Sequence, residues 1–154
     1  MSITKIFEDL SSAKFKKFFV FEKHIYKYRH KISKEDIDNF EMNNLVSLPT
    51  DFKEWWLIAG CGEIINNSLL IGEQESMFKL DKAGVMTGYI SLATDELRNY
   101  YVCDTQKSDK IYLCDGLGRG YCEIADSFYD FLTKLKNHNF DINNLIQNVQ
   151  LKPV

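Results

Sequence analysis

The segment Leu48-Pro49-Thr50-Asp51-Phe52-Lys53-Glu54-Trp55-Trp56 decides how the centre of the chain folds. Its proline ends the preceding element, and Thr50 or Asp51 is suited to cap a new helix. The apolar residues of that helix share one face and are expected in the core: Phe52, Trp55, Trp56 and Ala59. Gly60 and Gly62 are expected to end the helix, because glycine adopts the left-handed conformation common at helix C-termini.

A second helix is predicted immediately before this segment. Ser33 stands as its N-cap with Asp36 three residues later, and the acidic residues of the first turn complement the helix dipole. Ile37 and Phe40 supply its apolar face. The helical pattern ends near Asn43.

From Glu63 onward, strand patterns replace helical ones. Short apolar runs are separated by clusters of Asn, Asp, Gly, Ser and Lys that suit turns: 68–71, 77–80, 89–93, 100–103, 111–114 and 121–124. This series predicts a meander of antiparallel strands. A helix starting at Asp126 or Ser127 follows, with an apolar face made of Phe128, Phe131, Leu132 and Leu135. The apolar residues at 140–149 predict one more short helix.

The first 34 residues differ in charge from the rest of the chain. Residues 1–34 hold nine Lys/Arg and three Asp/Glu, a net charge of +6, whereas residues 35–154 hold ten and nineteen, a net charge of −9. Basic and aromatic side chains alternate from Ser11 to Ile32 at helical spacing, which predicts a helix, with a short strand at 18–21 as the alternative. Such a stretch is typical of a solvated basic face, of a membrane-surface helix or of an arm that binds nucleic acid.

Length and composition indicate one cytoplasmic domain. The chain has 154 residues, of which 45% are apolar and 27% charged, as in ordinary globular domains. No run approaches the roughly 18 apolar residues of a membrane span, and no signal-peptide pattern occurs. The acidic body is a poor binder of nucleic acid, because phosphate contacts need clustered Lys and Arg. It is suited to attract basic proteins.

The string Asp115-Gly116-Leu117-Gly118-Arg119-Gly120 joins two predicted strands. It matches neither the dinucleotide nor the nucleoside-triphosphate glycine motif, so a hairpin turn is the favoured interpretation. A turn centred on Gly118 pairs Cys114 with Cys122, with α-carbons about 4.5–5.5 Å apart. This pair would permit a metal or a strained disulfide, but all four cysteines lack a C-x-x-C spacing and are expected to be reduced, structural thiols: Cys61, Cys103, Cys114 and Cys122.

No catalytic motif is present in the sequence. His24 and His30 are six residues apart, which on a helix turns them about 240° from one another and prevents joint metal binding. Acid pairs such as Asp95 and Glu96 lack a partner base and are typical of solvated turns. We therefore predict no catalytic residue, no metal ligand and no cofactor. A small hydrolase using a carboxylate pair is the enzymatic alternative.

Three segments occur in an order that resembles one protein family. They are the capped helix at Ile32–Glu41, the segment at 48–56 with its glycine break Gly60-Cys61-Gly62-Glu63, and the segment Ile124–Leu132, with strands between the last two. Over roughly residues 32–136 the chain is similar to the SUKH superfamily. This superfamily includes fungal cell-wall synthesis regulators of the Smi/Knr type and many bacterial immunity proteins.

The resemblance implies an α+β fold, a single domain in which helices pack against a curved, mainly antiparallel β-sheet meander. The domain would occupy residues 1–154, with a family-like body at 32–136, a basic aromatic N-terminal extension at 1–31 and a C-terminal extension at 137–154. The implied function is that of a bacterial immunity protein that binds a cognate toxin, often a nuclease. The alternative is a non-enzymatic regulatory or scaffold module, contacting nucleic acid through the basic N-terminal segment.

An acidic protein body can cover the basic, phosphate-binding surface of a nuclease toxin, so inhibition by occlusion is expected, without a small-molecule substrate. Acids and aromatics expected to be exposed by strand alternation or in turns are the candidate toxin contacts. They are Asp95, Glu96, Tyr100, Asp104, Asp109, Asp115, Tyr121 and Glu123.

Overall fold

The computed structural model describes residues 2–17, 21–80, 86–117 and 120–153, without the side chains of residues 14–23. The helices in these ranges are α1 (Ile3–Ser12), α2 (Lys34–Asn44), α3 (Thr50–Ala59), α4 (Phe128–Asn137) and α5 (Ile142–Ile146), with a short 3-10 helix η1 (Gln74–Ser76). The strands are β1 (Lys14–Lys17), β2 (Phe21–His24), β3 (Tyr26–His30), β4 (Cys61–Ile64), β5 (Leu69–Ile71), β6 (Ile90–Thr94), β7 (Tyr100–Cys103), β8 (Ile111–Cys114), β9 (Gly120–Ala125) and β10 (Lys152–Pro153).

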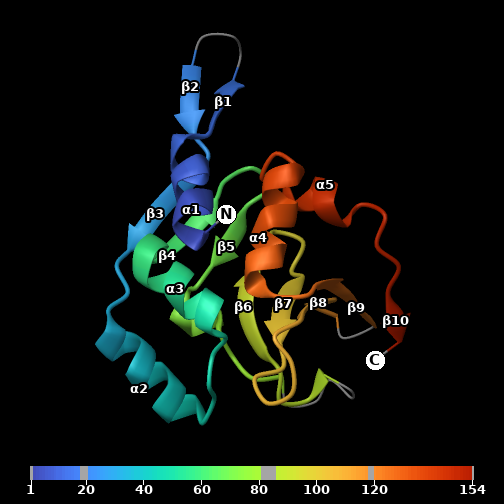
Figure 1. Cartoon of the computed structure of the whole chain (residues 1–154). Helices are drawn as coiled ribbons and strands as arrows, with labels where there is room; N and C mark the ends of the chain where they lie inside the picture. The colour runs from blue at the N-terminus through green and yellow to red at the C-terminus, as the bar shows by residue number, and fades with distance from the viewer. Residues whose placement is uncertain (1, 18–20, 81–85, 118–119, 154) are drawn as a thin grey trace.

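The main sheet of the described residues has eight strands in the order β10-β9-β8-β7-β6-β5-β4-β3, all antiparallel to their neighbours. Neighbours in sequence are neighbours in space from β3 to β9, which is a meander, and the sheet stays open. Helices α1, α3 and α4 lie together over one part of it, and the β1–β2 hairpin projects from the body (Figure 1). The predicted α+β single-domain fold is confirmed.

Helix α3 supplies the centre of the core, as predicted. Its apolar face is fully buried: Phe52, Trp55, Trp56 and Ala59. Two details of the prediction are wrong. Pro49, not Thr50 or Asp51, is the N-cap, and Asp51 instead accepts a hydrogen bond from the backbone N–H of Tyr129 at 2.8 Å. Gly60 ends the helix with a φ of 64°, but Gly62 lies within β4.

The predicted caps of the other helices are present. Ser33 and Asp36 form a reciprocal capping box at the start of α2, and Ser127 caps α4 by accepting from the backbone of Asp130. The predicted apolar face of α4 is buried, and α5 is the short helix expected in the tail.

The helix predicted between Ser11 and Ile32 is wrong. Helix α1 ends at Ser12, and the rest of this range forms the β1–β2 hairpin and β3, which pairs with β4. Pairing with a strand more than thirty residues away decides this conformation, and aromatic residues fit a pleated surface well. The alternative strand at 18–21 falls mostly on residues outside those described. Helix α1 buries Ile3, Ile6 and Leu10 in the main core.

Two expectations in the strand region are also wrong. Residues 77–80 form no strand but contribute one isolated bridge, from Lys79 to Ile90. In the β8–β9 hairpin Cys114 faces Tyr121, and Cys122 faces Leu113, so the register is one residue from the predicted one. A one-residue shift moves a side chain to the other face of a sheet. The two thiols therefore lie on opposite faces, and all four cysteines are free.

Candidate protein interface

Strands β7, β8 and β9 present two different faces. On the face covered by α4, their side chains join the main core: Tyr101, Cys103, Ile111, Leu113 and Ala125. The alternate residues form a second apolar cluster on the opposite face: Val102 and Cys114 with the partly buried Tyr100, Tyr112 and Tyr121. Tyr89, Leu80 and Met86 join this cluster from the segment before β6. We call this cluster the tyrosine face.

Aromatic contacts run across the tyrosine face. Tyr112 makes an edge-type contact with Tyr89 at 5.6 Å between ring centroids and a tilted one with Tyr121 at 6.4 Å. Tyr100 meets Phe78 edge-on at 5.2 Å, and Phe78 is 40% exposed. Tyrosine is enriched at protein interfaces, because its large ring packs well and its hydroxyl forms hydrogen bonds. This face is thus the part of the sheet best suited to bind another protein.

Acidic side chains border the tyrosine face. Burial and the nearby charge and hydrogen bond of Asp104 raise the pKa of Tyr89 above its usual value. Glu123 is exposed and pairs with Lys110 at 2.9 Å, and this hydrogen bond and charge raise the lysine pKa. An exposed pair of this kind contributes little to folding stability. Because the pair carries no net charge, steering of a basic partner rests on the overall negative charge of residues 35–154.

Four predicted contacts gather on the tyrosine face or at its border: Tyr100, Asp104, Tyr121 and Glu123. Asp109 is exposed in the turn between β7 and β8, at the same end of these strands as Asp104. Glu96 and Asp115 lie in the turns at the opposite end, where Glu96 is exposed and Asp115 half-buried.

Asp95 is not exposed, which corrects the expectation on which its choice rested. It is only 6% exposed, and its carboxylate accepts hydrogen bonds from Leu97 N, Asn99 N, Asn99 Nδ2 and the hydroxyl of Tyr101. These bonds hold the tight turn between β6 and β7. Asp95 is therefore a structural residue of this turn.

Sequence reasoning missed three aromatic residues as candidate contacts: Tyr89 and Tyr112 on the tyrosine face, and Phe78, which contacts Tyr100 beside it. Tyr112 could have been predicted from the sequence, because it lies two residues before Cys114 and so shares its face of β8. Phe78 and Tyr89 come from a segment that crosses this face without forming a regular strand. No periodic pattern marks such a segment.

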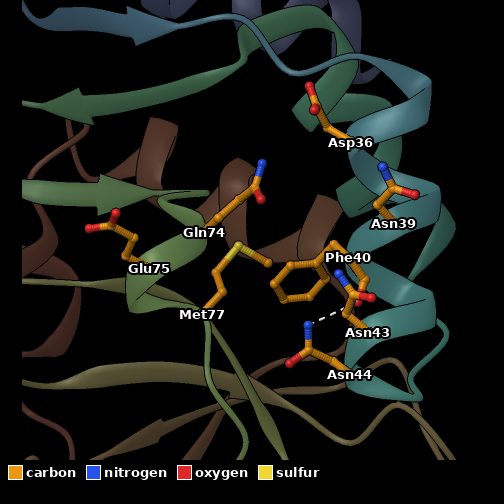
Figure 2. A pocket seen from close by; sticks show the side chains of 8 residues that line it. All are labelled: Asp36, Asn39, Phe40, Asn43, Asn44, Gln74, Glu75 and Met77. Atoms are coloured by element: carbon orange, nitrogen blue, oxygen red, sulfur yellow. Dashed lines mark hydrogen bonds between the residues drawn. The ribbon is translucent and has the colours of Figure 1, made fainter.

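A second candidate site is a hollow of about 380 Å³ between α2 and η1. Figure 2 shows Asp36, Asn39, Asn43 and Asn44 on the α2 side and Gln74 and Glu75 opposite, with Phe40 and Met77 between them. None of these eight lining residues is basic. The hollow is suited to accept hydrogen bonds from a polar or cationic group. The carboxylate of Asp36 is already engaged in the helix cap, which lowers its pKa.

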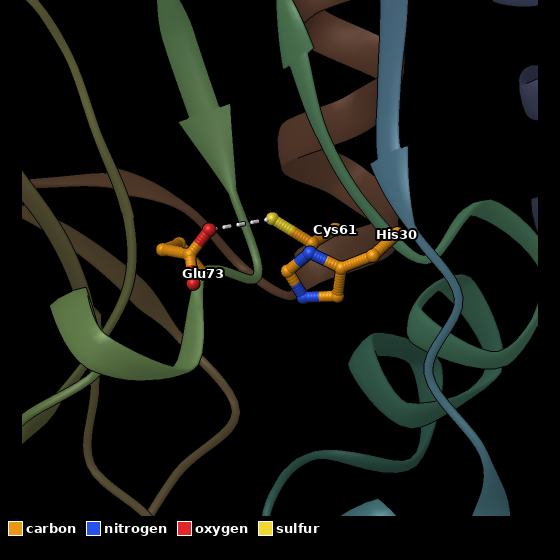
Figure 3. Close-up of side chains that lie close together, drawn as sticks. All are labelled: His30, Cys61 and Glu73. Atoms are coloured by element: carbon orange, nitrogen blue, oxygen red, sulfur yellow. Dashed lines mark hydrogen bonds between the residues drawn. The ribbon is translucent and has the colours of Figure 1, made fainter.

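Cys61 has a histidine nearby but is not equipped as a nucleophile. Its Sγ donates a hydrogen bond to Glu73 at 3.2 Å, and His30 lies beside it (Figure 3). Burial, together with the hydrogen bond and charge of Glu73, raises the pKa of the thiol to about 12. Nucleophilic cysteines need the thiolate at neutral pH. The thiol of Cys61 stays protonated there.

Comparison with known proteins gives one family match. The model of the SMI1 / KNR4 family (SUKH-1) matches residues 31–134, from the residues before α2 into α4. No curated protein and no solved structure gives a significant match. Among the described residues, no helix combines the length and the apolar character needed to cross a membrane.

Proposed function

Because the chain belongs to the SMI1/KNR4 family (SUKH-1), whose members are often immunity proteins against polymorphic toxins, we propose that it binds and neutralises a cognate protein toxin. The family match is the observation that carries this proposal. The family is generally non-catalytic, which agrees with inhibition by binding. The proposed mechanism is occlusion, in which the bound protein covers the active surface of the toxin.

The tyrosine face is the proposed contact surface. It offers half-buried tyrosine rings whose positions are set by cross-strand neighbours, so little side-chain freedom is lost on binding. Interface residues that dominate binding energy are enriched in Tyr, Trp and Arg. The proposed contacts are Tyr100, Asp104, Tyr121 and Glu123 with the added Phe78, Tyr89 and Tyr112, and with Glu96, Asp109 and Asp115 at the periphery.

Charge supports a basic partner, and a nuclease toxin is the class we propose. Residues 35–154 carry a net charge of −9. A nuclease must present Lys and Arg to the phosphate backbone, so its substrate-binding surface is attracted to an acidic protein. This attraction raises the association rate most at low salt.

The test starts from the gene beside the one for this chain. Its product, or the C-terminal domain of that product, is expressed in cells with and without this protein. The expected result is growth arrest in its absence, rescue in its presence and a complex on co-purification. Toxicity that this chain does not relieve, with no complex formed, would contradict the proposal.

Two variants locate the interface. Tyr121→Ala removes a ring from the tyrosine face, whereas Tyr28→Ala removes a tyrosine of β3 that is 56% exposed and lies outside this face. We expect Tyr121→Ala to weaken toxin binding at least roughly tenfold and Tyr28→Ala to leave it unchanged. Unchanged binding in Tyr121→Ala, with loss in Tyr28→Ala, would show that the toxin binds elsewhere.

The second candidate function is contact with nucleic acid through the β1–β2 hairpin. This hairpin projects from the body in Figure 1, and its sequence contains Lys14, Lys16, Lys17 and Lys23. The test is retention of nucleic acid by the purified protein and its dependence on salt. Loss of that binding when the four lysines are replaced by glutamine would favour this function over toxin binding.

A further inference from the structure

Three strand ends bring together side chains that the chain keeps far apart. His30 ends β3, Cys61 begins β4, and Glu73 lies two residues after β5. His30 and Cys61 are paired directly across β3 and β4, after an irregularity in the register between Tyr28 and His30. Bulges of this kind re-aim side chains at functional sites.

Gly60 is the residue that allows this approach. It has a φ of 64°, and a Cβ at this position would collide with the backbone oxygen of His30. Only glycine therefore lets α3 pass into β4 at this point without strain. The result is that Cys61 lies next to His30 immediately after the helix ends.

The three side chains are close enough to share one ion. The thiol of Cys61 is 3.2 Å from a carboxylate oxygen of Glu73, and one ligand atom from each of the three residues lies within 4.8 Å of the other two. Figure 3 shows the thiol of Cys61 between the carboxylate and the imidazole. Cys61 is buried, Glu73 half-buried and His30 exposed. The described residues hold no other such group of three.

We propose that His30, Cys61 and Glu73 bind a zinc ion through three protein ligands, with the fourth position open to solvent beside the exposed imidazole. Zinc takes nitrogen and oxygen ligands at about 2.0–2.2 Å and thiolate sulfur at about 2.3 Å, which places tetrahedral ligand atoms about 3.3–3.8 Å apart. Rotation of the exposed imidazole closes the remaining distance. As the zinc–sulfur bond forms, the thiol proton is released to solvent.

The donor set distinguishes zinc from the hard cations. Magnesium and calcium prefer all-oxygen sites, whereas a thiolate with an imidazole and a carboxylate suits a borderline-soft ion such as zinc. Thiolate and carboxylate together supply two negative charges, which balance the charge of the ion. The site lies at the ends of β3, β4 and β5, away from the tyrosine face on β7, β8 and β9. The proposed zinc site is therefore independent of the proposed toxin binding.

Cobalt(II) titration of the full chain tests this site, because cobalt replaces zinc and reports its ligands by absorption. We expect a thiolate-to-cobalt charge-transfer band that saturates at one equivalent and disappears when zinc is added. Zinc affinity is then measured by competition with a chromophoric chelator. A chain that develops no charge-transfer band would overturn the proposal.

Variants identify the ligands. Cys61→Ser, His30→Ala and Glu73→Gln should each lower zinc affinity at least roughly tenfold, since each removes one ligand. Cys122→Ser and His24→Ala, which alter another accessible thiol and another exposed imidazole, should bind as the unmodified chain does. If Cys61→Ser fails to fold, Glu73→Gln decides the matter, because it changes a half-buried side chain by one atom. Unchanged affinity in Glu73→Gln, or a band lost in Cys122→Ser, would refute the assignment.

Discussion

Tyr100 and Tyr101 are neighbours on β7, yet they belong to opposite faces of the sheet and to different surroundings. The ring of Tyr101 is 1% exposed and stacks on Phe131, with centroids 5.4 Å apart and an angle of 13° between the rings. Its hydroxyl donates to Asp95 at 2.7 Å. Tyr100 is half-buried and meets only the edge of Phe78 among the ring contacts of the described residues.

The comparison shows how one strand separates stability from recognition. Burial, with Asp95 beside it, raises the pKa of Tyr101 well above its usual value, so this tyrosine stays neutral and its polar atom is satisfied inside the protein. The tyrosines of the other face are only partly buried, and their rings pack against the second apolar cluster. Substitutions on the helix-covered face should therefore lower the free energy of unfolding, whereas substitutions on the tyrosine face should mainly weaken binding.

The largest effect is expected on the helix-covered face. Phe131→Ala removes a fully buried ring that contacts both Tyr101 and Phe128, and it should lower the free energy of unfolding by about 3–5 kcal/mol. Urea denaturation followed by tryptophan fluorescence measures this loss. Leu97→Ala, at a position 62% exposed, is the control and should change stability by less than about 0.5 kcal/mol. Similar values for the two variants would contradict the described core.

Asp95 should show the next largest effect. Asp95→Ala leaves the buried hydroxyl of Tyr101 without its acceptor and releases the turn at Asn99, so we expect a loss of about 2–3 kcal/mol. Its neighbour Glu96 is exposed, and Glu96→Ala should be nearly neutral. Thermal unfolding of the two variants, side by side, distinguishes a structural carboxylate from a solvated one. A neutral Asp95→Ala would contradict the structural role of this carboxylate.

Tyr112→Ala should separate the two faces most clearly. Because the ring is half-buried, we expect a stability loss of only about 1 kcal/mol. If Tyr112 is a principal contact, the Kd for the toxin should rise roughly 30-fold. Calorimetry of the complex and denaturation of the free protein supply the two values. A large stability loss with unchanged Kd would place Tyr112 with the core residues instead.

The smallest effect concerns the helical layer above the sheet. Hydrogen bonds from Lys136 of α4 and Lys5 of α1 hold the pKa of Asp9 below its usual value of 3.8, and the bond from Lys136 ties α1 to α4. The stabilising contribution of a carboxyl with a lowered pKa is complete above its unfolded pKa and is lost as the pH falls through its folded pKa. Asp9→Asn should therefore make the free energy of unfolding depend less on pH below pH 3.8. An unchanged pH dependence would show that these ion pairs contribute nothing to stability.

Local signals explain what could be predicted of the fold. The capping box of Ser33 and Asp36 and the apolar face of α3 involve residues within one or two helical turns, so the sequence alone contains them. Strand β3 is different, because its conformation depends on pairing with β4 across the whole of α2 and α3. The register between β8 and β9 shifts by one residue when the turn between them changes its length by one residue. The glycine-rich string at 115–120 is compatible with either turn length, so the sequence does not decide the register.

The candidate interface could be predicted in part, for the same reason. Strand alternation is a property of each strand alone, and it predicted exposed side chains at Tyr100, Tyr121 and Glu123. Glu123 is exposed, whereas Tyr100 and Tyr121 are half-buried in the tyrosine face. Strand alternation could not show that Asp95 turns inward to bind Tyr101, because this depends on the three-dimensional turn. The approach of His30 to Cys61 likewise requires the β3–β4 pairing, which the helical interpretation of this region excluded.

The two borders of the open sheet limit how another chain can attach. At one border, β10 pairs only two residues with β9, and one of them is Pro153, which has no backbone N–H to offer. At the other, β3 places the charged Lys27 and Arg29 in solvent. Short, proline-bearing and charged borders resist the addition of a further strand. Stacking of copies into fibrils is thereby discouraged, and partners are directed to side-chain surfaces.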